Sequence, residues 1–437
     1  MRIDLSQPAP RARTLEEAQA LIDELWLVLR AQAQQIEDQN RRIQILEERL
    51  RVSSRNSSTP PSADPQRPAR GKSPSGKKRG AQPGHSGKAR ALLPPEQIPH
   101  PHDCVPGPCS ACGGAVRITG LCDRHQVTEL PPILPVMTEY RLLAGTCCAC
   151  GQVCEAGLPP GVSRRVTGPR LRAAIGTLTG SYHLSKRQVQ GVLADLFGIE
   201  LSVGAISEGE AEIGAALQDI VQQAHVHVQQ AGVVHADETG HKQAGYRHWL
   251  WLAVAGAVAV FQAAASRSAQ AARAVLGERF AGILVSDRYG GYAWVETARR
   301  QLCWAHLLRD FTKIAERSGE SGRIGDELVA CTQRMFRFWH WARDGTLSRS
   351  MFTCHMRFLR HRIEALLQQG AQVRHAETAR TCRHILRLRQ ALWTFVDMSG
   401  VEPTNNTAER ALRSFVIWRK ISFGTRQCVA HAMSSAS

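Results

Sequence analysis

The stretch Gly232-Val-Val-His-Ala-Asp-Glu-Thr-Gly240 decides how the C-terminal half of this 437-residue chain is interpreted. It starts as a short apolar run, which is typical of a buried strand, and the run closes on an acidic residue, Asp237. A second run, Gly282-Ile-Leu-Val-Ser286, closes on Asp287 in the same way. One aspartate at the end of a strand is explained by capping of the next turn. Two in matching contexts favour a pair of carboxylates that binds cations.

The elements between these two runs indicate the fold. Residues 246–255 and 258–265 read as a hairpin that turns at Ala255-Gly256-Ala257, and 269–280 reads as a helix before the strand at 283–286. Strand, hairpin, helix and strand is the order of a ribonuclease-H-like core, in which the first and fourth strands are neighbours. We therefore predict a multidomain α/β protein with a ribonuclease-H-like core over 231–425 and a helical insertion at about 312–400.

Glu409 is the candidate third acid. It lies in Asn405-Asn-Thr-Ala-Glu-Arg410, at the start of a predicted helix. A capping box, with Asn406 as the cap and Glu409 reaching back to it, explains the same residues, and Glu364 and Glu377 compete for the role of third acid. Three carboxylates on rigid elements would supply the oxygen ligands that two Mg²⁺ (or Mn²⁺) ions need to act on a phosphodiester.

Charge indicates the class of partner. The formal net charge is +17 and the isoelectric point is near 9.8, which favours a polyanion and first of all nucleic acid. The N-terminus has no apolar signal region, and the apolar stretch 249–265 is too short to span a bilayer. We expect no membrane association and a cytoplasmic location.

The first 52 residues predict a coiled coil. Apolar residues recur every seven positions, and Leu25 and Leu46 occupy matching d positions, while Gln32 and Gln39 make the middle of the seam polar. The expected role is homo-oligomerisation; packing of the helix on its own protein is the alternative. The a positions are Leu15, Ile22, Leu29, Ile36, Ile43 and Leu50.

A basic linker follows at 53–98. It is rich in Ser, Pro, Gly, Arg and Lys, and contains Lys77, Lys78 and Arg79 beside several glycines. This composition predicts a segment that is disordered when free and suited to contact DNA phosphates; a solvated linker is the alternative.

Residues 99–160 predict a zinc-ribbon-like domain. Cys109 and Cys112 form one knuckle and Cys147 and Cys150 a second, each followed by glycine, as a tetrahedral Zn²⁺ site requires. Buried free thiols are the alternative, and the sequence leaves other ligands open: His100, His102, Cys104, Cys122, Cys148 and Cys154. The gap between the knuckles has room for a hairpin including 126–130 and 136–143. Residues 161–230 predict short helices that fit a DNA-binding helix-turn-helix or a plain bundle equally well.

Together these motifs resemble the transposases of the insertion-sequence-66 family. The resemblance rests on the heptads, the Ser53–Ser62 stretch, Gly80-Ala-Gln-Pro-Gly-His85, the paired knuckles, Asp237-Glu-Thr-Gly240, Cys303-Trp-Ala-His306 and Asn405-Asn-Thr-Ala-Glu-Arg-Ala-Leu-Arg413. It implies a bacterial DDE transposase that cleaves element ends and transfers strands by a two-metal mechanism, near the nucleoid. It implies terminal inverted repeats and target DNA as partners, with accessory proteins from the same element. It implies Asp237, Asp287 and Glu409 as catalytic residues, with His306, Arg309, Arg410, Arg419 and Lys420 near the DNA.

One departure from the family pattern lies at 426–437, where the tail has no apolar period and predicts a truncation. A defective DNA-binding remnant that regulates active copies is therefore an alternative, and a cellular nuclease with the same core is another.

Overall fold

The structure is a computed structural model that describes residues 12–50, 52–53, 56–57 and 91–421. The chain divides into two compact units: 1–65 with 165–189 and 203–437, and 66–164 with 190–202. Two predictions lie outside the described residues, namely the DNA-contacting Lys77, Lys78 and Arg79 and the atypical tail at 426–437.

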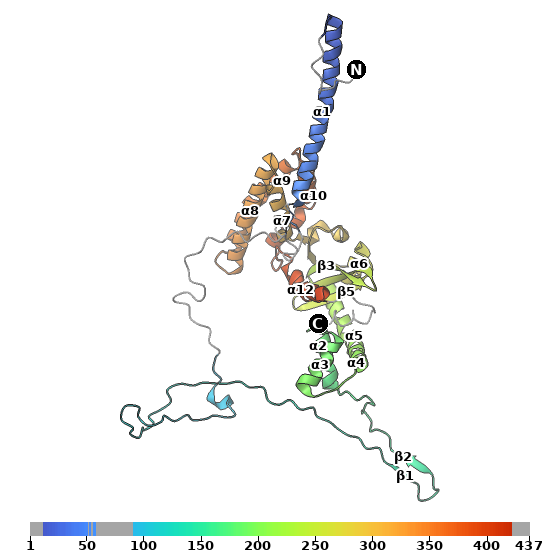
Figure 1. The fold of residues 1–437 in the computed structure, drawn as a ribbon, viewed down its shortest axis with the longest axis vertical. Coiled ribbons are helices and arrows are strands. Elements are labelled where there is room, and N and C mark those ends of the chain that lie inside the picture. Colours follow the sequence, from blue (N-terminus) through green and yellow to red (C-terminus); the bar gives the residue numbers. More distant parts are fainter. Residues whose placement is uncertain (1–11, 51, 54–55, 58–90, 422–437) are drawn as a thin grey trace. The chain divides into compact units, whose positions relative to one another are not determined.

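A mixed sheet is the centre of the first unit (Figure 1). Its described strands are β3 (Val233–Gln243), β4 (Tyr246–Ala255), β5 (Val258–Ala264), β6 (Ile283–Ser286) and β7 (Arg300–Leu302), in the order β5-β4-β3-β6-β7. The strands β5, β4 and β3 pair antiparallel, whereas β3, β6 and β7 pair parallel. The predicted pairing of the first and fourth strands is confirmed.

Two strands differ from the sequence prediction. β3 does not end at Asp237 but continues to Gln243, because its polar second half pairs with β4 from Asp237 opposite Leu252 onwards. β7 was not predicted because it begins with Arg300 and Gln301. Both side chains are buried, and that of Gln301 is satisfied by backbone groups, since its Oε1 accepts the Phe395 N–H at 2.8 Å.

The two faces of the sheet are covered by different helices. Successive residues of a strand point to opposite faces. Trp251, Ala253 and Ala255 pack toward α6 (Ala269–Leu276), and the alternate β4 residues pack against α12 (Asn406–Ile421). The helix α6 was expected to reach residue 280 but ends at Leu276, where Gly277 takes a φ of 92°. The α12 contact joins Leu250, Leu252, Val254 and Phe261 to Ala408, Leu412 and Phe415.

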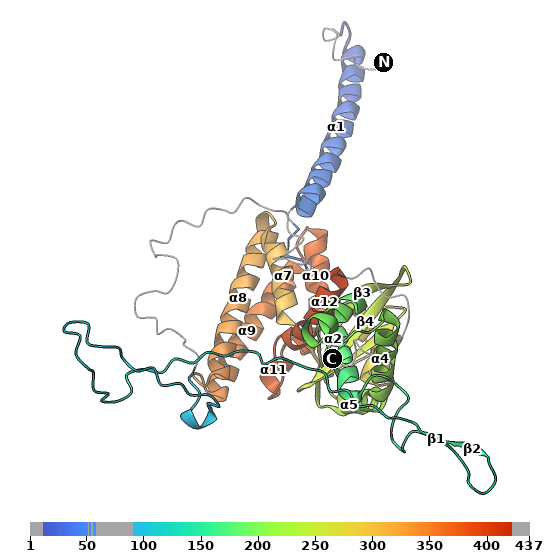
Figure 2. The same ribbon diagram turned by 60° about the horizontal axis from the view of Figure 1, so that its bottom comes forward.

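A helical region stands beside the sheet (Figure 2). It consists of α7 (Trp304–Ala315), α8 (Gly319–Arg343), α9 (Arg349–Gly370), α10 (Ala376–Arg387) and α11 (Thr394–Asp397), and helical character over most of 312–400 is as expected. Apolar residues of α7 recur at spacings of three and four and are buried, so α7 joins the sheet to this region. They are Trp304, Leu307, Phe311 and Ile314. Short 3-10 turns lie at Gly290–Tyr292, Thr297–Arg299 and Arg389–Leu392.

The heptad segment is one helix, α1 (Leu15–Leu50). Its apolar seam is exposed, with Leu29 at 53% and Ile36 at 57% of full exposure. Farther along the chain come α2 (Pro169–Gly180), α3 (Lys186–Phe197), α4 (Val203–Ala216) and α5 (Gln218–Gln230). Among the described helices, none has the length and apolarity that crossing a bilayer requires.

The second unit has little regular structure in its described part. A 3-10 turn lies at Pro95–Gln97, and the strands β1 (Ala144–Thr146) and β2 (Val153–Glu155) pair antiparallel around the second knuckle. Residues 126–130 and 136–143, all of them described, form no strand, contrary to the expected hairpin. Their apolar side chains are exposed, and a two-stranded hairpin without a packing partner is only marginally stable.

Candidate active site

Asp237 and Asp287 are brought together by the strand register. His235 of β3 lies opposite Val285 of β6 in this parallel pair. Asp237 comes two residues after His235, and Asp287 comes two residues after Val285. Neighbouring strands run about 4.8 Å apart, and positions that differ by two share a face. Both side chains therefore leave the sheet on the face that α12 covers, because Asp237 pairs with Leu252, which packs against that helix.

Glu409 reaches the same face through a buried junction centred on Asn405. The Asn405 side chain, 1% exposed, donates from Nδ2 to the carbonyl of Ala236 at 2.8 Å, and its backbone N–H donates to the Cys303 sulfur at 3.2 Å. Its carbonyl accepts the Glu409 N–H at 3.1 Å and so starts α12. The first half of β3, the start of α7 and the first turn of α12 are fixed to one another at this residue.

The Glu409 carboxylate faces His306, with 3.8 Å between Glu409 Oε1 and His306 Nδ1. It does not reach back to Asn406, so the capping box is not formed between these described residues. Burial and the nearby Arg309 lower the pKa of His306, so the imidazole is neutral near pH 7 and the contact is not an ion pair. Of the competing acids, Glu364 pairs with Arg360 on α9, and Glu377 pairs with Arg317.

The electrostatics of Asp237 show that the acids influence one another. Burial first, and then the charges of Glu238, Asp287 and Glu409, together raise its pKa to about 8, against a hydrogen bond from the Glu238 N–H that lowers it. Like charges on one face are unfavourable until a cation or proton neutralises them.

The donor atoms fit a hard divalent cation such as Mg²⁺ or Mn²⁺. Glu409 Oε1 is buried and accepts no hydrogen bond, and the three acids offer only oxygen. Cys303, His306 and Glu409 also place ligand atoms within 4.8 Å of one another. Cys303 is a poor ligand, since burial raises the pKa of its thiol to about 11 and its sulfur already accepts the Asn405 N–H.

Glu238 is a buried carboxylate close to the three half-buried acids, and sequence reasoning missed it. It points to the opposite face, where it accepts the Tyr292 hydroxyl at 2.5 Å and Arg267 Nε at 2.8 Å. Burial, followed by Asp287, raises its pKa. Arg267 is in turn held over the Tyr289 ring, 3.7 Å from its centroid. Only the acidic pair Asp237-Glu238 in the sequence hinted at this arrangement.

A pocket of about 440 Å³ opens beside Asp287 and His306, and several arginine side chains line it. Arg288 is paired with Asp310 and with His384 Nδ1, the latter at 2.9 Å. Arg309 has no ion-pair partner among the described residues. Asp237 and Glu409 lie outside the pocket wall. Its lining is Asn56, Ser57, Arg267, Asp287, Arg288, Tyr289, His306, Arg309, Asp310 and His384.

The basic residues of α12 differ in exposure. Arg410 and Lys420 are exposed. Arg419 donates to Thr239 Oγ1 at 2.7 Å and to the Gly240 carbonyl, so its guanidinium ties the helix to β3. Lys186 lies in the predicted helix-turn-helix, where its Nζ is 2.9 Å from Glu210 Oε2. One basic residue of this region is therefore paired within the protein.

The two cysteine knuckles have the same backbone form. The first Cys carbonyl accepts an N–H four residues later, from Gly113 at 2.8 Å and from Gly151 at 2.9 Å. Both glycines have positive φ, 69° and 75°. Backbone N–H groups, Ala111 first for Cys109 and Ala149 first for Cys147, lower the pKa of both thiols and so favour thiolates.

The donor chemistry of the knuckles fits Zn²⁺, but the structure does not bring the two pairs together. Across the described residues, the one cluster of three or more ligand atoms contains Cys303, His306 and Glu409 rather than knuckle sulfurs.

Two parts of the chain match known families. Residues 164–431 match the Transposase IS66 family, and residues 7–91 match a Family of unknown function (DUF6444). No curated protein matches the chain closely enough to be reported as a relative. The first match spans more than half of the sequence and includes the three acids, the Cys303–His306 motif and α12. The chain belongs to the IS66 family of transposases.

Proposed function

We propose that this protein cleaves DNA at the ends of a mobile element and joins the freed ends to target DNA, with Asp237, Asp287 and Glu409 as ligands of two divalent cations. The observation that carries the proposal is geometric: the pairing of β3 with β6 and the bonds of Asn405 direct Asp237, Asp287 and Glu409 toward one face of the sheet. The family supplies the substrate class. The strand order, with β3 beside β6, supports a ribonuclease-H-like core.

The three acids would divide the cations between them. The charges of both Asp287 and Glu409 act on Asp237. Asp237 would therefore contribute a ligand to both cation sites, while Asp287 and Glu409 would each complete one of them. Bound cations would activate the attacking water or 3′-hydroxyl and stabilise the leaving oxygen. Asn405 bonds the first turn of α12 and also the Ala236 carbonyl of β3, next to Asp237, which supports a fixed place of Glu409 relative to Asp237.

DNA would be held by the positively charged side chains around the pocket. Arg309 lines the pocket without an ion-pair partner among the described side chains, so it is available to a phosphate. Arg410 is exposed one residue after Glu409. Each phosphate neutralised releases counterions and adds affinity. We extend this role to Lys77, Lys78 and Arg79 from their composition alone.

Cleavage of element ends tests the proposal. Purified protein with Mg²⁺ and DNA carrying the terminal repeats should give nicked ends. Asp237→Asn should slow this by at least about a thousandfold, because several kcal/mol of transition-state stabilisation is lost. Asp219→Asn is the matched control, because Asp219 is exposed on α5. Equal activity in Asp237→Asn would remove Asp237 from the mechanism, and cutting that ignores the terminal repeats would indicate a general nuclease.

Two further roles complete the proposal. The exposed apolar seam of α1 fits self-association as a coiled coil. The lowered thiol pKa values of the knuckles support structural Zn²⁺ binding by Cys109, Cys112, Cys147 and Cys150.

A further inference from the structure

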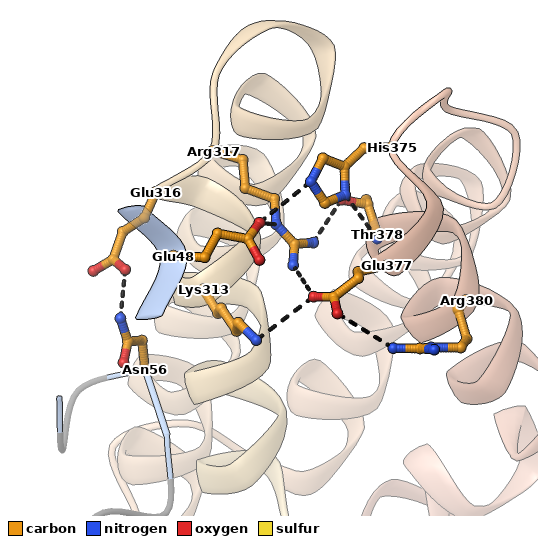
Figure 3. Close-up of polar contacts among 9 residues, drawn as sticks. All are labelled: Glu48, Asn56, Lys313, Glu316, Arg317, His375, Glu377, Thr378 and Arg380. Atoms are coloured by element: carbon orange, nitrogen blue, oxygen red, sulfur yellow. Dashed lines mark hydrogen bonds and ion pairs between the residues drawn. The ribbon is translucent and has the colours of Figure 1, made fainter. Parts of the chain in front are cut away.

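The last turn of α1 is joined to the catalytic half of the chain by ion pairs (Figure 3). Glu48 Oε1 lies 3.0 Å from Arg317 Nε and 3.2 Å from His375 Nε2. The Arg317 side chain is only 6% exposed. A contact to so deeply buried a cation is screened far less than a pair on the surface.

Arg317 does not depend on Glu48 alone. It also lies 3.0 Å from Glu377 and donates to Thr378 Oγ1 at 2.7 Å. Glu377 in turn lies 3.7 Å from Lys313. Loss of Glu48 would therefore remove this contact of α1 without leaving a buried guanidinium unpaired.

The turn that follows α1 is anchored on the same surface. Asn56 is 5% exposed and donates from Nδ2 to Glu316, just past the end of α7. Its Oδ1 accepts the Ser53 N–H at 2.8 Å, and Ser57 Oγ donates to the Ser53 carbonyl at 2.6 Å. A cavity of about 100 Å³ lies between the end of α1 and the surface around Arg317, and residues of both line it.

The same turn forms part of the active-site pocket. Asn56 and Ser57 line it together with Asp287 and His306. Both residues are uncharged, so they form part of the pocket wall without repelling a phosphate. They lie in the wall of a pocket that still measures about 440 Å³, which favours a completed site over a plugged one.

We propose that Glu48, Asn56 and Ser57 are a working part of the active site. Glu48 latches α1 to Arg317 and His375, and this latch holds Asn56 and Ser57 as positioning residues that keep the DNA strand against Asp287. The inference rests on the proposed DNA cleavage for its purpose, but the latch itself can be measured without DNA.

Amide hydrogen exchange of the full-length protein tests the latch. Peptides containing Asn56 should exchange about tenfold faster in Glu48→Gln, as the loss of one charge-assisted hydrogen bond allows. Glu37→Gln is the matched control, because Glu37 is exposed in the middle of the same helix. Equal exchange in Glu48→Gln and the wild type would overturn the latch.

Cleavage kinetics test the positioning role. Asn56→Ala and Glu48→Gln should each lower the single-turnover cleavage rate about tenfold. Affinity for the DNA end and the melting temperature should stay near those of Glu37→Gln. Faster cleavage in either variant would overturn the proposal in favour of an inhibitory strap, and unchanged rates would overturn it as well. A wild-type protein that cleaves no DNA would end the proposed function and this role together, whereas the exchange experiment would still decide whether the latch exists.

Discussion

Asn405 carries more of the active-site geometry than any of the acids does. Its side-chain Nδ2 donates a hydrogen bond to the Ala236 carbonyl, and its Oδ1 lies 3.3 Å from His235 Nδ1. Asn405→Ala leaves these buried groups unsatisfied, so we expect the free energy of unfolding to fall by about 1–3 kcal/mol. Urea unfolding measures the loss.

Thr404→Ala is a suitable control for Asn405→Ala, because Thr404 is adjacent and makes no hydrogen bond among the described side chains. The metal-dependent cleavage rate of Asn405→Ala should fall as well, since Glu409 loses its fixed start. An Asn405→Ala protein with wild-type stability would show that the junction does not hold these elements together.

Asp237 gives the site a pH dependence. Its pKa is raised to about 8, so at lower pH the carboxyl carries a proton that a cation must displace. The affinity for Mg²⁺ should therefore rise as the pH increases toward about 8 and level off above it. Calorimetric titration near pH 7, in two buffers of different ionisation enthalpy, should detect proton release on binding. No proton release would mean that cations do not displace the Asp237 proton.

At the scale of elements, the knuckles are the clearest test of a metal. Replacing Cys109 and Cys112 by Ser removes one pair of thiols with its turn left intact. We expect purified wild-type protein to contain zinc and the double variant to lose it, as measured by elemental analysis. Cys354→Ser should keep the metal, because Cys354 is an exposed thiol on α9. Wild-type protein without zinc would exclude the site.

Elements with a strong apolar period could be predicted from the sequence, and those held by tertiary contacts could not. The strands β4, β5 and β6 alternate or are continuously apolar, so their positions follow from the residues. The polar half of β3 and all of β7 owe their form to neighbouring strands and to buried partners such as those of Gln301. The expected hairpin between the knuckles was wrong because its apolar residues remain exposed and pack against none of the described residues.

The candidate site divides in the same way. The apolar runs before Asp237 and Asp287 explain why these two acids could be predicted from the sequence, although β3 continues past Asp237. Glu409 needed the family resemblance, because a capping box explained it equally well in the sequence. The buried bonds of Glu238, and the seat of Asn56 beside Glu316, depend on residues that are distant in the sequence, and no local pattern predicts them.

At the scale of the whole molecule, self-association depends on the seam of α1. Leu29 lies on the a position of the heptads and Leu27 on the opposite face, and both are exposed, at 53% and 67%. Leu29→Asp places a charge in the seam, where it would be buried between two helices, whereas Leu27→Asp places the same charge in solvent. We expect Leu29→Asp to dissociate the oligomer and Leu27→Asp to leave it intact.

Light scattering coupled to size exclusion measures the mass of both variants. The latch between Glu48 and Arg317 gives this experiment a second readout, because it ties each α1 to an active-site pocket. If the coiled coil holds two active sites together for paired cleavage, Leu29→Asp should still nick single ends but lose concerted joining of two ends. An equal mass for the two variants would show that the exposed seam does not drive assembly.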